Sequence, residues 1–371
     1  KADLDYIKSA GMEIKTDSAL GEDYTIDDLL DQGYKSVFLA TGSHQSLKLD
    51  VPGEEIEGVI PGMQALTALN LGKKIELGKR VGIIGGGNTA VDAARRVLRA
   101  ETSDSLTMID AARSALRTTK PESVTIFYRR TIDEIPAYKE EVDGAGDEGI
   151  KIEYLTAPKR LISGKGKLKA CEFIRMKLGD IDESGRRSPV PIEGSEFIVE
   201  LDTLIVSISE SPDISFLKNE GLEFSKWDTI LIDQETCLTK RPGIFAGGDV
   251  VTGPNTVVEA VAAGKIASES IDQYLTGKEV KREYKLIRPS RYIEPFEFSD
   301  EELDELLSAK RSEMPLLSSE KRKYNLMEVH QGLTEEQAIK EAKRCLRCEL
   351  ETKDGKRFLE SLEEVKNGIV E

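Results

Sequence analysis

The chain has 371 residues, which is enough for two domains with sizeable hydrophobic cores. Its 39% hydrophobic and 32% charged residues are typical of a soluble globular protein, and no apolar run is long enough to span a bilayer. Acidic residues outnumber basic ones by 68 to 52, so the net charge of −16 argues against nucleic acid or an anionic membrane as a partner. Four cysteines are too few for a disulfide framework, and we therefore expect a reducing, cytoplasmic location.

The first part of the chain predicts an incomplete α/β domain. Residues 2–14 are expected to form a helix that leads directly into a strand. Residues 34–40 have the pattern of a buried strand that ends at Thr41 and Gly42. Because the first residue is Lys1 and nothing upstream can pair with the first strand, we expect an N-terminally truncated chain.

After this region β-rich and helical runs alternate, which predicts parallel sheets with crossover helices. The expected elements are strands at 81–84, 124–128, 201–208 and 243–246, helices at 89–99 and 255–274, and antiparallel strands at 150–155 and 168–176. From residue 277 the composition becomes charged and dotted with proline, which predicts an extension with two or three helices.

The strongest local motif is GIIGGGNTA at residues 82–90. Gly85 allows a tight turn after the strand, Gly87 lets a pyrophosphate approach the backbone, and Ala90 lets the helix pack closely on the strand. The free N–H groups that open the helix at Asn88 and Thr89 would face the phosphates. The motif therefore predicts a dinucleotide-binding turn.

The end of the next strand decides which nucleotide is preferred, because an acid there suits NADH and arginines suit NADPH. Residues 106–110 end in Asp110, whereas 124–130 end in Arg129 and Arg130. The second segment is the better strand, since the first runs on with helical spacing. We therefore predict NADPH, with NADH as the alternative, and a mostly helical insertion over 101–122.

Four motifs follow one another along the chain: GGGNTAVDAARR, VTIFYRRTIDEIPA, CEFIRMKLGDIDESGRRSPVPIEGSEF and GIFAGGDVVTGPNTVVEAVAAGKIA. Over residues 20–275 this order resembles the FAD- and NADPH-binding small (beta) subunit of glutamate synthase and related flavin subunits of electron-bifurcating oxidoreductases, in the pyridine nucleotide-disulfide oxidoreductase superfamily. The resemblance implies an α/β fold with two Rossmann-like dinucleotide-binding domains. The NADPH domain would be inserted in an incomplete FAD domain, with a helical C-terminal extension.

The resemblance also implies domain boundaries and site residues. The partial FAD domain would cover 1–78, the NAD(P)H domain 79–240, the return to the FAD domain 241–276, and the extension 277–371. The NADPH pyrophosphate would be held by Gly85, Gly87, Asn88, Thr89 and Ala90, with Arg129 and Arg130 at the 2′-phosphate. Around FAD, the resemblance places Thr41, Gly42, Gly248, Asp249, Asn255, Thr256 and Val257.

Two departures from the family pattern concern FAD. A segment that reads Ala-Ile-Gly-Gln in the family is Ser207-Ile208-Ser209-Glu210 here. The first FAD-binding βαβ unit, with its own glycine-rich turn, is absent. We therefore expect FAD to be held weakly or lost in this chain.

A Cys-x-x-Cys pair, Cys345 and Cys348, follows an amphipathic helix near the C-terminus. Two thiolates supply half of the ligands that a [4Fe–4S] cluster needs, so the rest would come from missing sequence or a partner. An idle pair is the alternative, since no βαβ context supports a redox dithiol. Cys171 and Cys237 fall in or beside strands and are expected in the core.

These observations predict an oxidoreductase module that takes hydride from NADPH onto FAD and passes electrons to an iron–sulfur or other redox subunit of a larger complex. No side chain is assigned a catalytic role, and a homo-oligomer is compatible with the sequence. Two other functions stay open: a disulfide reductase of related fold, and a non-catalytic scaffold that binds a nucleotide.

Overall fold

The computed structural model describes residues 2–71, 73, 75–99, 121–182, 185–282, 299–308, 310–322 and 328–343. The chain divides into two compact units, Lys1–Arg282 and Glu283–Glu371. Within the first unit we distinguish an insert lobe (residues 47–206) from a flanking lobe (residues 2–46 and 207–282). In the described part of the chain, no helix has the length and apolarity needed to cross a membrane.

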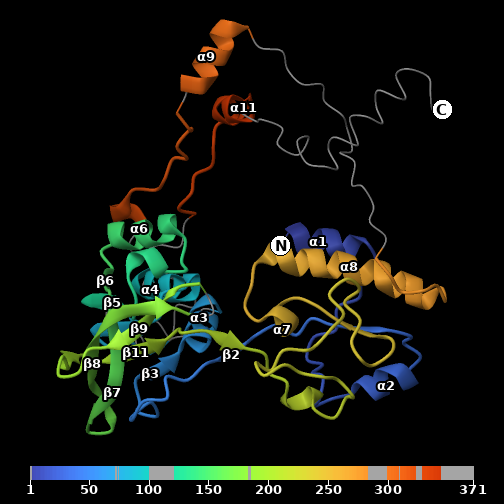
Figure 1. Cartoon of the computed structure of the whole chain (residues 1–371), viewed down its shortest axis with the longest axis horizontal. Helices are drawn as coiled ribbons and strands as arrows, with labels where there is room; N and C mark the ends of the chain where they lie inside the picture. Colours follow the sequence, from blue (N-terminus) through green and yellow to red (C-terminus); the bar gives the residue numbers. More distant parts are fainter. Residues whose placement is uncertain are drawn as a thin grey trace, which may run out of the picture. The chain divides into compact units, whose positions relative to one another are not determined.

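A five-stranded parallel sheet forms the centre of the insert lobe (Figure 1). Its order is β3-β11-β4-β5-β6, and its strands are β3 (Val59–Pro61), β4 (Arg80–Ile84), β5 (Ser123–Phe127), β6 (Lys151–Glu153) and β11 (Thr203–Val206). All four residues of β11 and four of the five in β4 are buried, as expected for central strands covered on both faces. The strands expected at 81–84, 124–128 and 201–208 are confirmed.

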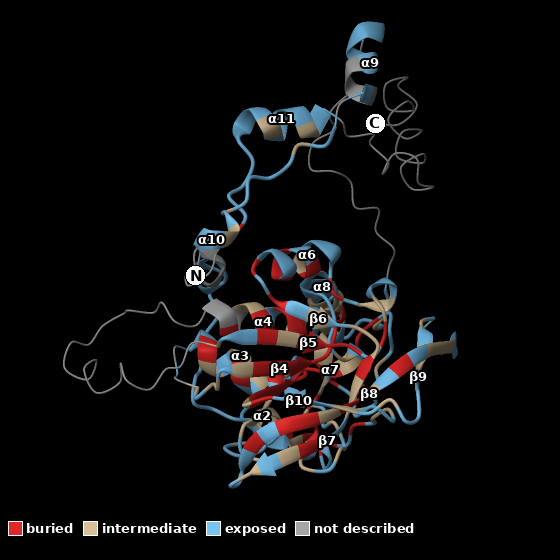
Figure 2. Ribbon diagram, turned by 90° about the vertical axis from the view of Figure 1, so that its left-hand side faces the viewer, coloured by how far each residue is buried: buried red, intermediate tan, exposed pale blue. Residues whose placement is uncertain are grey.

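One face of this sheet is covered by α3 (Gly62–Asn70), α4 (Asn88–Arg99) and α6 (Lys139–Asp147). Small side chains on α4, including Ala90, Ala93 and Ala94, are fully buried and let the helix lie close to β4 and β5. Figure 2 shows the buried residues concentrated on these strands and on α4. The helix expected at 89–99 is thus confirmed.

An antiparallel sheet covers the other face. It consists of β7 (Thr156–Gly164), β8 (Lys167–Ile181), β9 (Arg187–Pro191) and β10 (Phe197–Glu200). Phe127 of β5 stacks on Phe173 of β8 with ring centroids 4.1 Å apart, in a core shared by the two sheets.

The expectation of an antiparallel strand at 150–155 is wrong, whereas the antiparallel strand at 168–176 is confirmed. The first segment instead forms β6 and joins the parallel sheet beside β5, and β7 is the antiparallel partner of β8. Six residues of mixed polarity do not reveal which neighbour a strand will pair with, because alternation fits an edge strand of either sheet.

The flanking lobe is built around two short parallel strands, β1 (Val37–Leu39) and β13 (Ile244–Ala246), paired from Val37↔Ile244 to Leu39↔Ala246. Besides α1 (Ala2–Ser9), this lobe contains the helices α2 (Ile26–Asp31), α7 (Asp249–Thr252) and α8 (Val257–Leu275). Its core comprises Ile26, Leu39, Leu217, Leu222, Ile230, Ile244, Ala246 and Val250. The strands expected at 34–40 and 243–246 and the helix at 255–274 are confirmed.

The helix expected at 2–14 is present only in part, because α1 (Ala2–Ser9) ends five residues earlier and Met12 and Ile14 are exposed. The strand expected directly after residue 14 is absent, since residues 15–19 have no strand structure.

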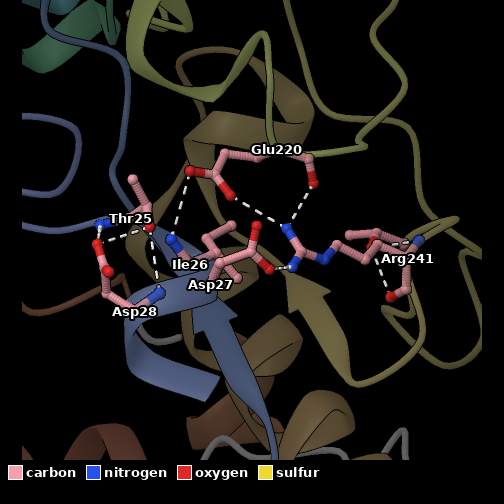
Figure 3. A network of polar contacts seen from close by, with 7 residues as sticks. Thr25, Ile26, Asp27, Asp28, Glu220 and Arg241 are labelled. Carbon is pink, nitrogen blue, oxygen red and sulfur yellow. Dashed lines mark hydrogen bonds and ion pairs between the residues drawn. The ribbon is translucent and has the colours of Figure 1, made fainter. Parts of the chain in front are cut away.

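A polar network closes the flanking lobe around the start of α2 (Figure 3). Glu220 accepts a hydrogen bond from the backbone N–H of Ile26, and Arg241 donates to the carboxylate of Glu220 at 3.0 Å and also pairs with Asp27. Thr25 caps the helix reciprocally with Asp28. The contacts of Ile26 with Glu220 and of Asp27 with Arg241 join residues that are 194 and 214 positions apart in the sequence.

The chain passes between the lobes twice, and the two passages pair with each other. After β1 it runs through β2 (Gln45–Ser46) into the insert lobe, and it returns through β12 (Glu210–Ser211) toward β13. The strands β2 and β12 are antiparallel, with Glu210 opposite Ser46. The insert lobe is therefore one continuous stretch of sequence, inserted between the two stretches that form the flanking lobe.

The second unit contains three described helices, α9 (Asp300–Ser308), α10 (Ser319–Arg322) and α11 (Glu335–Lys343). An isolated bridge joins Leu316 to His330, and the backbone of Ser312 donates to Glu341 at 2.6 Å. The two or three helices expected in this extension are confirmed. Cys345 and Cys348, and most of the insertion expected at 101–122, lie outside the described residues.

Candidate functional site

The glycine turn joins β4 to α4, as the motif predicts. Gly85 has φ +143°, and a Cβ atom on it would lie 2.1 Å from the carbonyl oxygen of Ser207, so the position requires glycine. The same Cβ would lie 3.1 Å from the Cβ of Ala90, which is fully buried. The helix and the strand therefore approach each other closely because both positions carry small residues.

Gly86 and Gly87 face different surroundings. A Cβ on Gly86 would lie 2.5 Å from the ring of Tyr128, which packs beneath the turn. A Cβ on Gly87 would meet nothing within 4 Å. The outer side of the turn is therefore open to a ligand, as expected of a backbone that cradles a pyrophosphate.

The helix α4 begins at Asn88, whose carboxamide oxygen accepts a hydrogen bond from the backbone N–H of Tyr138 at 3.1 Å. Asn88 is exposed, and Thr89 is half-buried. The N–H of Ala90 donates to the carbonyl of Gly87 at 3.0 Å, so the N–H groups of Asn88 and Thr89 are those that lack an acceptor within the helix, at the positive end of its dipole. This end of α4 can therefore bind an anion beside Gly87.

The two arginines after β5 have different environments. Arg129 is exposed and has no ion pair within the described residues, whereas only 4% of the surface of Arg130 is accessible. Arg130 donates from Nε to the carbonyl of Arg187 at 2.7 Å and from Nη2 to the carboxylate of Asp182. The sequence-based prediction assigned both arginines to the 2′-phosphate, but only Arg129 is open to a ligand.

The environment of Arg129 is rich in positive charge. The pKa of its guanidinium is lowered by partial desolvation and, in addition, by the positive charges of Arg130 and Arg186. Tyr128, the preceding residue, packs against Gly86, so Arg129 follows directly from the residue that supports the glycine turn. A phosphate group bound near Arg129 would relieve the repulsion between these cations.

The predicted flavin residues Thr41, Gly42, Gly248 and Asp249 lie at the carboxyl ends of the paired strands β1 and β13. Ser43 joins the two chain segments by donating from its hydroxyl to the carbonyl of Asp249 at 2.9 Å. The Oγ1 atom of Thr41 is buried and has no hydrogen-bond partner among the described residues. A buried hydroxyl of this kind is a candidate ligand contact, because an unsatisfied polar atom costs free energy.

The return strand ends in a sharp glycine turn. A Cβ on Gly247 would lie 2.9 Å from the ring of Phe38, so this position permits close packing between β13 and β1. Gly248 has φ +71° and leads into α7. Asp249, the first residue of α7, is half-buried and can accept hydrogen bonds from hydroxyl groups.

The start of α8 carries the last predicted contacts. Thr256 caps the helix by accepting from the N–H of Glu259, and Glu259 accepts from the backbone N–H of Thr256 in return. Asn255 is exposed, and 79% of Val257 is accessible. The predicted nucleotide residues thus gather at the ends of β4 and β5 in the insert lobe. The predicted flavin residues at 41–42 and 248–249 gather at the ends of β1 and β13 in the flanking lobe.

Sequence reasoning missed the contribution of the β8–β9 hairpin and of Glu210. Asp182 and the backbone of Arg187 hold Arg130, and the motif GRR at 185–187 was a signal that could have drawn attention to this hairpin. Glu210 is half-buried, and its pKa is raised by burial and by the charge of Asp249. The signal that could have identified Glu210 is that it ends the segment 207–210, which departs from the family pattern.

The described cysteines do not form a redox pair. Cys171 and Cys237 are free and buried, and burial raises the pKa of the Cys171 thiol to about 12. Such a thiol is a poor nucleophile at neutral pH. No cluster of three or more metal-binding side chains occurs within the described ranges.

Comparison with known sequences assigns most of the first unit to one family. The family model for pyridine nucleotide-disulphide oxidoreductases matches residues 6–264. The beta subunit of an NADP(+)-dependent formate dehydrogenase from Moorella thermoacetica is 41% identical over 276 residues, covering 74% of this chain and 36% of that protein. The beta subunit of an NADPH-Fe(3+) oxidoreductase from Geobacter sulfurreducens is 34% identical and covers 93% of this chain and 53% of that protein.

The glutamate synthase [NADPH] small chain from Escherichia coli is 30% identical, over 71% of this chain and 55% of that protein. The chain therefore spans roughly a third to a half of these relatives' lengths. Among solved structures, FprA from Mycobacterium tuberculosis matches with a TM-score of 0.58 at 19% identity, covering 74% of this chain and 72% of that chain. Its complex with NADPH matches with a TM-score of 0.54 at 20% identity, over 70% and 67% of the two chains. These two matches show the fold.

Proposed function

This chain belongs to the pyridine nucleotide-disulphide oxidoreductase family, and from that premise we propose that it is a flavin-dependent electron-transfer module that accepts hydride from NADPH. Membership confirms the resemblance inferred from the four ordered motifs. The module would pass electrons to a redox partner subunit, in line with three relatives named as beta subunits or as a small chain.

One observation carries the choice of NADPH. Gly87 and Arg129 follow the neighbouring parallel strands β4 and β5, so an open glycine turn and an exposed guanidinium lie at the same edge of the sheet. In dinucleotide-binding folds this edge receives the pyrophosphate and the adenosine ribose. Arg129 supplies the cation that the 2′-phosphate of NADPH requires and that NADH does not use.

The residues of the flanking lobe fit a flavin. The buried Thr41 hydroxyl, the glycine turn at Gly248 and the carboxylate of Asp249 offer polar contacts at the carboxyl ends of β1 and β13. The capped start of α8 adds the positive end of a helix dipole, which would favour negative charge nearby. FAD, when bound, supplies the hydride acceptor and releases electrons singly.

The chain's own role is then to position the cofactors, with Gly85, Gly87, Asn88, Thr89 and Ala90 at one site and Thr41, Gly42, Gly248 and Asp249 at the other. The Asn255-Thr256-Val257 segment would lie beside the flavin. No side chain is assigned as acid or base, because the cofactors carry the chemistry and the protein fixes their orientation. We also propose that Cys345 and Cys348 ligate a [4Fe–4S] cluster completed by cysteines outside this chain.

The proposal is tested by measuring NADPH and NADH dissociation constants by fluorescence titration for the unmodified chain and for Arg129→Ala. We expect the NADPH constant to rise about 10- to 100-fold, the effect of one charged hydrogen bond, while the NADH constant stays within about threefold. Arg160→Ala, which removes the same charge from an exposed site on β7, is the matched control. Equal losses for both nucleotides would contradict the assignment and favour Asp110 as the ribose ligand.

A further inference from the structure

Arg130 is committed to the β8–β9 hairpin. Its guanidinium donates to the carbonyl of Arg187, the first residue of β9, and to the carboxylate of Asp182, which follows β8. Since only 4% of Arg130 is accessible, a ligand could reach its guanidinium only if the hairpin moved away. The contacts therefore anchor the hairpin to the end of β5.

The carboxylate of Asp182 also holds the backbone of Arg186. Oδ2 of Asp182 accepts from Arg130, and Oδ1 accepts from the backbone N–H of Arg186 at 3.4 Å. The backbone of Arg186 is thus one carboxylate away from the Arg130 guanidinium. Arg186 is half-buried, and its positive charge contributes to lowering the pKa of Arg129.

We propose that Arg186 is the second cation of the 2′-phosphate subsite, that it acts together with Arg129, and that Arg130 is a positioning residue that docks the hairpin carrying Arg186. This inference rests on the proposed function, because it refines the subsite for NADPH. It differs from the sequence-based assignment, in which the neighbours Arg129 and Arg130 both bind the phosphate.

The arrangement is consistent with the chemistry of the group. A 2′-phosphate carries up to two negative charges and presents three oxygens, so two guanidinium groups from different directions can neutralise it. Arg129 comes from the parallel sheet and Arg186 from the antiparallel hairpin. Arg129 and Arg130 lie in a bend after β5, where the hairpin contacts hold Arg130 inward while Arg129 remains exposed.

The direct test is Arg186→Ala in the full chain, with NADPH and NADH dissociation constants measured by fluorescence titration. We expect about a 10-fold or larger increase for NADPH and a change of less than about threefold for NADH. Arg186→Lys should recover part of the NADPH affinity, because it restores the charge but not the planar fork. Lys169→Ala, an exposed charge on the same strand β8, serves as the control and should leave both constants unchanged.

A double-mutant cycle tests the positioning role. Asp182→Asn should weaken NADPH binding by loosening the hairpin, while Asp182→Asn combined with Arg186→Ala should be little worse than Arg186→Ala alone. Additive losses, with circular dichroism showing both proteins folded, would mean that Asp182 does not act through Arg186 and would overturn this role.

The outcomes also separate this inference from the proposed function. If Arg129→Ala abolishes the preference for NADPH but Arg186→Ala does not, the subsite lacks Arg186 and the proposed function still stands. If neither substitution changes the ratio of the two constants, the NADPH assignment itself fails, and this inference fails with it.

Discussion

The insert lobe and the flanking lobe both carry residues expected at a dinucleotide site, but they support those residues differently. In the insert lobe the glycine turn follows the middle strand of five, with helices on one face of the sheet and a second sheet on the other. In the flanking lobe the corresponding residues follow two paired strands of three residues each. The first site is therefore held rigidly from both sides, and the second has less support within the described residues.

The helices next to the two sites show the same contrast. On α4, Val91 and Val97 are buried almost completely against the sheet. On α8, Val257 and Val258 are 79% and 78% exposed, and Val261 is also exposed. Parallel sheets are normally covered on both faces. From this difference we expect the insert lobe to bind its nucleotide well by itself and the flanking lobe to hold FAD weakly.

The largest effect is expected from an ion pair buried inside the insert lobe. The side chain of Glu148 is inaccessible and accepts from Arg95 at 2.9 Å, which joins α6 to α4. Glu148→Ala would leave a largely buried guanidinium with only Glu141 as its other ion-pair partner among the described residues. We expect the free energy of unfolding to fall by about 3–5 kcal/mol in urea denaturation.

Glu220→Ala is the matched change in the flanking lobe, where it removes a partner of Arg241 whose own side chain is 19% accessible. If the flanking lobe is the less rigid one, this change should cost clearly less than Glu148→Ala. An equal or larger cost would show that the polar network of Figure 3 supports its lobe as firmly as the buried pair supports the other.

The second effect concerns the glycine turn itself. Gly85→Ala would place a methyl group against the backbone carbonyl of Ser207 at a φ unfavourable for alanine, and we expect a loss of about 2–4 kcal/mol in unfolding free energy. Gly87→Ala has space for its methyl group and should fold normally, yet it should weaken both NADPH and NADH, because the pyrophosphate approaches there. Normal folding of Gly85→Ala would contradict the packing described for this turn.

The sequence predicted the insert lobe well because its signals are local. The strand before Gly85 and the helix after it are adjacent in the chain, so periodicity and turn chemistry are enough to identify them. The different roles of Arg129 and Arg130 could not be predicted, because they depend on a hairpin more than 50 residues later. The same limit applies to β6, whose choice of partner depends on two competing sheets rather than on its own residues.

A smaller effect on the free energy of unfolding is expected from Glu210, which lies in β12 where the chain passes between the lobes. Burial and the charge of Asp249 raise the pKa of Glu210, so the folded state favours the protonated form. This carboxyl group contributes most to stability below its unfolded pKa, and the contribution is lost as the pH rises through its folded pKa. Glu210→Gln should therefore stabilise the chain at pH 7, by no more than about 1 kcal/mol after solvent screening.

The pH dependence distinguishes this cause from a general packing effect. The difference in thermal midpoint between Glu210→Gln and the unmodified chain should shrink as the pH falls toward the ordinary value of 4.5. Glu259→Gln is the opposite control, because the hydrogen bonds from Thr256 lower the pKa of Glu259, and this substitution should destabilise the chain at pH 7. A gain for Glu210→Gln that persists unchanged at low pH would rule out the proposed repulsion from Asp249.

The smallest effect is expected on the exposed face of α8, and it tests the comparison between the lobes most directly. Valine and serine have similar helix propensities, so Val258→Ser on a surface that water reaches should change the free energy of unfolding by less than about 0.5 kcal/mol. Val91→Ser on α4 removes a fully buried side chain and adds a hydroxyl, and should cost several times more. If Val258→Ser instead costs more than about 1.5 kcal/mol, the α8 face is covered in solution. Sedimentation at several protein concentrations would then show whether a second copy covers it, because that cost would be accompanied by dissociation of the oligomer.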